Sequence, residues 1–304
     1  MAIAETIVNG LIQGSLYALF AASFTIIFGV MDIPNMTHGV MFATGAYIFY
    51  YVFEVMGLPW YIGVVGGIVS VAVMGVVIER VFLDQLYERE ESEYVFGVIL
   101  VTFGLALIGE QFIGQFFGHD NYLIEIPVLL NTSYDVFGAT VNLAQLAIVV
   151  YGAVCFLFLY WFTNHTLMGH SLRAIEQDRE LAYMKGVNVE WVYLFTFVLG
   201  AVMISIAGIL YGTLFSLSPG MGFNLLIKSF IIVILGGIGR IYGAAVAGYG
   251  LGLYEAFAIS FIDSYFIFAS EFLALIIFVL IKALLTKDDL PGPLRPIVRA
   301  IGGN

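Results

Sequence analysis

The feature that most constrains this chain is a series of long apolar runs that fills most of its 304 residues. Hydrophobic residues make up 61% of the chain and charged residues only 11%, with a mean hydropathy of +1.00. Soluble domains carry about 25% charged residues, so this chain lacks the side chains needed to cover a surface in water. The sequence therefore predicts an all-α, polytopic transmembrane helix bundle whose main partner is the lipid bilayer.

The apolar runs predict about eight or nine spanning segments in a single domain that covers residues 1–304. The runs are 7–30, 37–56, 59–79, 95–117, 142–163, 191–215, 225–239, 241–262 and 265–285. As a helix, the 225–239 run would be only about 22 Å long, which is less than the hydrocarbon thickness of a bilayer. We therefore expect a short or re-entrant segment there. The first run is too long for a signal peptide, so we interpret it as a true span.

Several chemistries find no support in the sequence. It contains no phosphate-binding loop of the Walker type, no His-Glu-x-x-His pair and no Gly-x-Ser-x-Gly elbow. Cys155 is the only cysteine, so neither an intrachain disulfide nor a cysteine-based metal site is expected. The formal net charge of -11 argues against binding to nucleic acid. We expect a chain that is not an enzyme and that holds no metal or cofactor.

The distribution of Lys and Arg predicts how the chain is oriented. These residues occur in the connections 80–94 and 164–190 and in the tail 286–304, whereas 118–141 contains none. Basic loops are retained in the cytoplasm. We therefore expect the connections 80–94 and 164–190 and the tail 286–304 in the cytoplasm, and the connection 118–141 outside the cell membrane. Three runs precede the first basic connection, which places the N-terminus outside and the C-terminus in the cytoplasm. An even number of later crossings requires a break near 236–240.

A break in the helical pattern and a set of glycine pairs are two further features of the spans. Pro34 breaks the helical pattern after the first run, and non-helical backbone at membrane depth normally lines a cavity or is buried in protein. The candidates for a substrate pathway at this break are Asn35, Thr37, His38 and Gly39. An ordinary turn, with Asn or Thr capping the next helix, is the alternative. Glycine pairs spaced by four residues, such as Gly10/Gly14 and Gly248/Gly252, predict closely packed helices.

Ionisable side chains within the spans are a third feature. They are Glu110, Glu255 and Glu271, with Lys228 near the end of a run. Such residues usually face the bundle interior or a water-filled cavity because a carboxylate is costly in hydrocarbon. Glu110 and Gln111 are the best candidates for lining a pathway. A structural hydrogen bond between helices is the alternative interpretation.

The basic connection 164–190 alternates charged and apolar side chains in a way that predicts short amphipathic helices. It is a candidate docking surface for a cytoplasmic partner, and a solvated linker is the alternative.

Four passages together resemble a known family of transporters. They are the Asn9–Leu19 stretch, the Phe28–Tyr47 stretch with its Pro-Asn-Met-Thr-His-Gly core, Arg173–Asn188, and Val233–Ala244. In this order they resemble the H-type permease subunit of branched-chain amino acid ABC importers, a family that also includes urea and amide permeases. The glutamate that begins the more familiar coupling motif of permeases has no clear equivalent here.

The resemblance implies partners and a mechanism. A second, homologous permease would pair with this chain, two cytoplasmic ATP-binding subunits would bind the 164–190 loop, and an extracytoplasmic substrate-binding protein would deliver the solute. ATP-driven alternating access would follow. The residues implied in coupling to the ATPase are Arg173, Glu176, Asp178, Ala182 and Gly186. Val40 stands where a urea-type relative would carry an acidic residue, which favours amino acids. A urea or amide permease and an ion-coupled secondary transporter are the alternatives.

Overall fold

The fold is that of a helical bundle with one small β-hairpin. The computed structural model describes residues 3–86, 91–124, 132–136, 139–259, 261 and 264–285. The helices are α1 (Ile3–Met31), α2 (His38–Tyr50), α3 (Trp60–Val77), α4 (Glu91–Phe117), α5 (Leu143–His165), α6 (Leu167–Gln177), α7 (Arg179–Met184), α8 (Val189–Gly212), α9 (Met221–Gly236), α10 (Ile241–Ala258) and α11 (Ser264–Leu285). The π-helical segments η1 (Tyr51–Val55) and η2 (Ile78–Leu83) extend α2 and α3, and the short 3-10 helix η3 (Asp84–Leu86) follows. Strands β1 (Ser133–Val136) and β2 (Ala139–Asn142) pair antiparallel.

The predicted class of a polytopic helical membrane bundle is confirmed. Among the described residues, five helices are long and apolar enough to cross a membrane, or up to six if α9 and α10 together form one span. Those two helices meet at 118° around the short Gly237–Arg240 connection, which confirms the break expected near 236–240. The total of eight or nine spans stays a prediction. It also counts α11 as one span, and α2 together with η1 as another, and neither is among these five helices.

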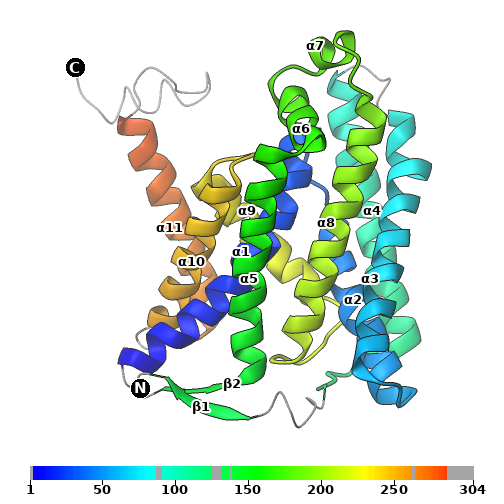
Figure 1. The fold of residues 1–304 in the computed structure, drawn as a ribbon. Helices are drawn as coiled ribbons and strands as arrows, with labels where there is room; N and C mark the ends of the chain where they lie inside the picture. The colour runs from blue at the N-terminus through cyan, green and yellow to red at the C-terminus, as the bar shows by residue number, and fades with distance from the viewer. Residues whose placement is uncertain are drawn as a thin grey trace.

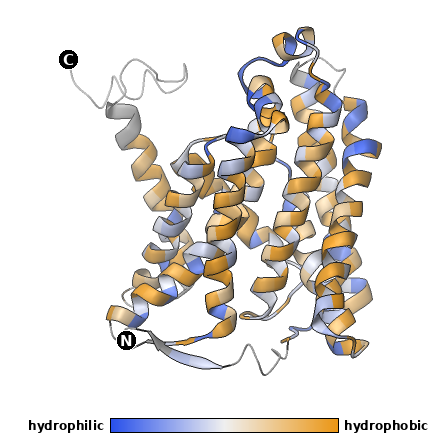
Figure 2. Cartoon of the chain, in the orientation of Figure 1, coloured by the Kyte–Doolittle hydropathy of each residue, from blue (hydrophilic) through white to orange (hydrophobic). Residues whose placement is uncertain are grey.

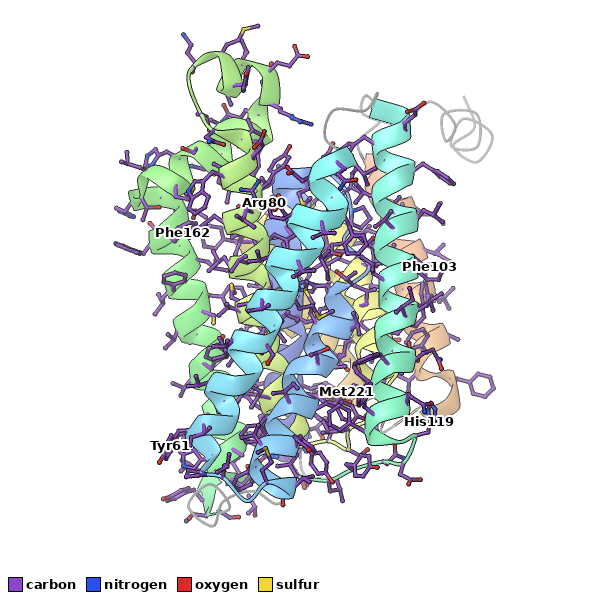
Figure 3. The ribbon with its side chains drawn as sticks, turned by 90° about the vertical axis from the view of Figure 1, so that its right-hand side faces the viewer. Tyr61, Arg80, Phe103, His119, Phe162 and Met221 are labelled. Carbon is purple, nitrogen blue, oxygen red and sulfur yellow. The ribbon has the colours of Figure 1, made fainter. Side chains whose placement is uncertain are left out.

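Figure 1 shows that the connections group at two opposite ends of the bundle. Helices α6 and α7 stand at one end, where η3 and the last turn of α11 also lie; Arg80 marks the same end in Figure 3. The β-hairpin and the start of α1 lie at the other end. The predicted cytoplasmic tail 286–304, like segments 87–90 and 125–131 of the predicted connections, lies outside the described residues.

Helix α1 forms the centre of the bundle and packs along α10. A Cβ atom on Gly14 would lie 2.9 Å from the Cα of Tyr249, and one on Gly252 would lie 2.3 Å from Gly14. Gly248 meets Ala18 in the same way, at 2.6 Å. These glycines let two backbones approach closely, as the four-residue spacing predicts.

Helices α3, α4 and α5 form an outer layer. Large apolar side chains cover their outward faces, among them Val65, Phe112 and Leu157. Figure 2 shows the shafts of these helices as largely hydrophobic, with hydrophilic residues concentrated over α6, α7 and their connections. The outer layer therefore suits lipid or another membrane subunit, and the end of the bundle that carries α6 and α7 suits water.

Candidate functional site: a helical platform, a broken-helix crossing and a buried charge cluster

The platform at one end of the bundle consists of α6 and α7 within the 164–190 connection. The predicted short helices are therefore present, and side chains begin each of them. Thr166 Oγ1 accepts a hydrogen bond from the Gly169 N–H (3.0 Å), and Asp178 Oδ1 accepts one from Leu181 N–H (2.9 Å). Asn188 caps α8 through the Trp191 N–H at 3.0 Å. Such caps satisfy amide donors that a helix cannot satisfy itself, so the connection has a defined shape.

A groove of about 1310 Å³ runs beside α7. Its lining residues include Asp84 of η3, Tyr183 and Met184 of α7, and Glu190 of α8. The groove is apolar in part, since Tyr183 is 72% exposed and Met184 is 75% exposed. An exposed apolar surface of this kind, rimmed by charges, is typical of a contact with another protein.

The five predicted coupling residues have different surroundings in this platform. Arg173 donates a hydrogen bond from Nη1 to Asn164 Oδ1 at 3.0 Å, and Asp178 serves as the α7 cap. Ala182 is buried against the chain itself, so its small size serves the packing of α7. Gly186 lies on the groove with φ +86°, and a Cβ there would meet no atom within 4 Å.

Glu176 connects the platform to the bundle. Its carboxylate lies 2.7 Å from the position of a Cβ on Gly29, where Gly239 of the α9–α10 connection also approaches. The residue keeps much of its surface exposed, yet desolvation on its inner side raises the pKa of Glu176 to about 7, with Arg173 opposing the shift. The end of α6 thus touches α1 at Gly29, and the α9–α10 connection meets α1 at the same residue.

The break after α1 is confirmed as non-helical backbone. Asp32 has φ 56°, in the left-handed region that Asp tolerates better than most residues. Asn35 Oδ1 accepts hydrogen bonds from the Thr37 amide (3.0 Å) and the Thr37 hydroxyl (2.6 Å). Thr37 makes no side-chain cap to α2. His38 Nε2 lies 2.9 Å from Ser23 Oγ, and its ring packs on Phe20 and Phe24.

The first turn of α2, directly after the break, meets the start of α9. A Cβ on Gly39 would lie 2.6 Å from the Gly222 carbonyl oxygen, so the two backbones are in contact. Glu110 lines a cavity of about 20 Å³ beside this crossing, and its carboxylate approaches Gly220. Gln111 is exposed on α4 and does not line this cavity. The structure therefore joins Gly39 and Glu110 but leaves Gln111 outside.

A cluster of ionisable side chains is the part of the site that sequence reasoning did not assemble. Lys228 Nζ lies 2.7 Å from Glu255 Oε2 and 3.1 Å from Glu271 Oε1, and it donates to Tyr17 Oη at 2.9 Å. Tyr17 in turn donates to Glu255 Oε2. All four residues are buried. The sequence showed ionisable residues in separate spans, but only their opposite signs hinted at a pair, and nothing pointed to Tyr17.

A metal site is a different matter. Within the described parts of the chain, no three His, Cys, Asp or Glu side chains come close enough to hold a metal ion.

Known proteins resemble this chain over most of its length. Residues 6–284 match the model of the family described as "Branched-chain amino acid transport system / permease component". The branched-chain amino acid permease LivH of Escherichia coli is 29% identical over 287 residues, which cover 90% of this chain and 91% of LivH. BraD of Pseudomonas aeruginosa, also named as a branched-chain amino acid permease, is 28% identical, with coverages of 83% and 85%.

More distant similarities extend to an archaeal chain, a sugar permease and a solved structure. A probable LivH of Methanocaldococcus jannaschii is 25% identical, with coverages of 85% and 82%. The fructose import permease FrcC of Rhizobium meliloti matches only 35% of this chain, at 32% identity. The structure of PsaBC from Streptococcus pneumoniae in complex with Fab superposes with a TM-score of 0.48 at 12% identity, covering 98% and 94% of the two chains. The family match over residues 6–284 shows that this chain belongs to the permease components of branched-chain amino acid transport systems.

Proposed function

We propose that the chain is the membrane permease subunit of an ABC importer for branched-chain amino acids and works by alternating access. In this proposal the platform of α6 and α7 lies in the cytoplasm with the C-terminus, and the N-terminus and the β-hairpin lie outside the cell membrane. The observation that carries it is the capped, partly apolar platform of a chain whose family consists of transport permeases.

The distribution of basic residues supports this orientation. Arg173, Arg179 and Lys185 belong to the platform, and Arg80 lies at the same end of the bundle. Basic residues in short loops are retained on the cytoplasmic side. The β-hairpin lies at the opposite end, and the connection 118–141 to which it belongs contains no Lys or Arg in the sequence.

Other subunits complete the proposed importer. Two cytoplasmic ATP-binding subunits would occupy the grooves beside α7, a homologous permease would cover part of the exposed outer layer, and an extracytoplasmic substrate-binding protein would deliver the amino acid. This chain contains no Walker sequence, so the ATP-binding subunits would supply the energy.

Motion would reach the pathway through contacts on α6. When the ATP-binding subunits close, the platform would push Glu176 against Gly29, which Gly239 contacts in turn. Those glycines belong to α1 and to the α9–α10 connection, so the push would reach the crossing of Gly39 with Gly222. Packed helices whose backbones touch directly slide past each other as rigid bodies. Such sliding suits a transport pathway that opens alternately to the two sides of the membrane.

An ion-coupled secondary transporter is the second candidate, and the buried Lys228 cluster favours it. Paired intramembrane charges are common in ion-driven carriers. The two functions differ in their energy source: uptake by the importer stops when ATP hydrolysis is inhibited by vanadate, whereas uptake by a carrier continues. A urea or amide substrate would instead be revealed by competition with leucine uptake.

A substitution at Gly186 tests the docking role. In cells that carry the whole transporter, Gly186→Trp is expected to abolish leucine uptake while membrane insertion stays intact, because the indole fills the groove that receives the ATP-binding subunit. Gly186→Ala is the matched control: it meets the same left-handed φ, at a cost of about 1–2 kcal/mol, without the bulk.

Normal uptake by Gly186→Trp would contradict the docking role. Labelling from outside the cell of a cysteine introduced at Tyr183 would contradict the orientation as well.

A further inference from the structure

A second cavity lies on the other side of the molecule from the platform. It has a volume of about 290 Å³ and lies between α1, α8, the connection 213–220, α9 and α10. Met221, one of its lining residues, lies in the half of the bundle that carries the β-hairpin (Figure 3). Pockets for small molecules start at about 300 Å³, so this cavity has room for one small solute.

The polar wall of the cavity is the buried charge cluster. Lys228 and Glu255 both line it, together with Tyr17. The three N–H donors of the Lys228 ammonium already have three acceptors, namely Tyr17, Glu255 and Glu271. Lys228 therefore has no N–H donor left for a ligand in this state.

The cluster contains more negative than positive groups. Two carboxylates share a single ammonium, and Glu271 Oε2 is buried without a hydrogen bond. Glu255 uses Oε2 for Lys228 and Tyr17, while the residue faces the cavity. An ammonium group in the cavity would therefore bind Glu255 and neutralise the negative charge that Lys228 alone leaves unpaired. Pairing lowers the free-energy cost of burying a charge.

The other walls of the cavity provide for the remaining parts of an amino acid. Helix α9 begins here at Met221, and Gly220 at its N-cap gives it no side-chain hydrogen bond. The Met221 and Phe223 N–H groups already donate to the Ser218 and Gly220 carbonyl oxygens, so the start of α9 attracts a carboxylate through the helix dipole. Apolar side chains complete the wall: Leu16, Phe215, Met221 and Leu225.

We propose that this cavity is a transient binding site for the zwitterionic head of the transported amino acid. Glu255 accepts hydrogen bonds from the α-ammonium, the α-carboxylate meets the start of α9, and the branched side chain packs on Leu16 and Leu225. Tyr17 and Lys228 hold the Glu255 carboxylate in place. This site rests on the proposed function as an amino acid permease, and it adds the residues that would recognise the substrate.

Protection from alkylation tests the site in the assembled transporter. With Cys155→Ala as background, Asn224→Cys introduces a single thiol on the cavity wall, at a side chain that is exposed. Leucine is expected to slow alkylation of this thiol. Isocaproate is leucine without its ammonium group. Because it lacks one hydrogen bond between charged groups, the concentration needed for equal protection is expected to be at least about ten-fold higher than for leucine.

A matched pair of carboxylate variants separates binding from structure. Glu255→Gln and Glu271→Gln each remove one negative charge beside Lys228, but only Glu255 lines the cavity. Protection by leucine should be lost in Glu255→Gln, which removes the acceptor, and only weakened in Glu271→Gln, which removes the surplus charge but keeps the acceptor. Equal loss in both variants would overturn the assignment, as would protection by isocaproate or by sodium chloride as strong as that by leucine.

The isocaproate comparison needs no change in the cluster, so it decides the matter even if Glu255→Gln does not assemble. Normal leucine uptake with an unprotected thiol would refute this site and leave the proposed function standing. Absence of vanadate-sensitive leucine uptake in the unmodified transporter would refute the proposed function instead.

Discussion

Helices α1 and α4 are nearly equal in hydropathy and opposite in environment. Their most apolar stretches have mean hydropathies of 1.8 and 1.9, yet 89% of that stretch is buried in α1 and only 17% in α4. Hydropathy places both helices in a membrane but does not distinguish a helix that faces protein from one that faces lipid. Side-chain size and hydrogen bonding make that distinction.

Small and polar residues identify α1 as the protein-facing helix. Its buried face combines small residues such as Gly14 with two serine hydroxyls. Ser15 Oγ donates to Tyr249 Oη of α10 (3.2 Å), and Ser23 Oγ lies 2.9 Å from His38 Nε2 of α2. Without a hydrophobic drive between helices in lipid, close backbone contact and such hydrogen bonds hold helices together. Helix α4 instead presents Phe96, Ile108 and Phe116, each more than 60% exposed. It turns only a narrow side, with Glu110, toward α2 and α9.

Removing Lys228 should have the largest effect on the buried side of this comparison. Lys228→Met leaves the carboxylates of Glu255 and Glu271 without their cation, and leaving a buried charge unpaired costs about 3–5 kcal/mol. The free energy of unfolding in detergent is the measurement. Lys185→Met, on the exposed platform, is the control and should change it by less than about 0.5 kcal/mol.

The triple variant Lys228→Met, Glu255→Gln, Glu271→Gln should recover most of the stability lost in Lys228→Met, since it removes the uncompensated charge. Equal stability of Lys228→Met and Lys185→Met would mean that the cluster is not buried as described.

A glycine substitution compares the two helices directly. In Gly14→Leu the new side chain meets the Tyr249 backbone at 2.9 Å, and overpacking of this kind costs about 1–3 kcal/mol. In Gly104→Leu, on α4, the new Cβ meets nothing within 4 Å. Thermal unfolding of the purified protein should show a lower Tm for Gly14→Leu and an unchanged or slightly higher one for Gly104→Leu. Similar losses in both would show that α4 is as tightly packed as α1.

Much of the fold follows from the sequence, because each relevant signal is local. Apolar length predicts the spans, Pro34 predicts the break after α1, and the four-residue spacing of Gly10 and Gly14 predicts a closely packed face, which α1 turns toward α10. The platform helices are equally local, since Thr166 and Asp178 cap them from within the connection.

The site was harder to predict because its members come from distant parts of the chain. Tyr17 and Glu255 are 238 residues apart, and no pattern in either span points to the other. Ala182 illustrates a second limit: a small residue beside a turn fits a partner surface or the packing of its own helix equally well, and here it is buried. Gln111 illustrates a third, because adjacent helical residues such as Glu110 and Gln111 point in different directions.

The smallest predicted effect concerns the end of α1 that meets the platform. The pKa of Glu176 is raised to about 7 from an ordinary 4.5 because its inner side is desolvated. The folded state therefore binds the proton more tightly, and stability present below about pH 4.5 is lost as pH rises through about 7. Much of the side chain stays exposed, so solvent screening keeps the loss under about 1 kcal/mol. The free energy of unfolding of the purified protein should decrease more between about pH 5 and pH 8 for the wild type than for Glu176→Gln. Glu180→Gln is the control: it removes the same charge on exposed α7 without changing the contact with Gly29.

A pH profile of Glu176→Gln that parallels the wild type would show that the stability gained from the contact between α6 and α1 does not depend on protonation of Glu176. The platform would then touch α1 without depending on it.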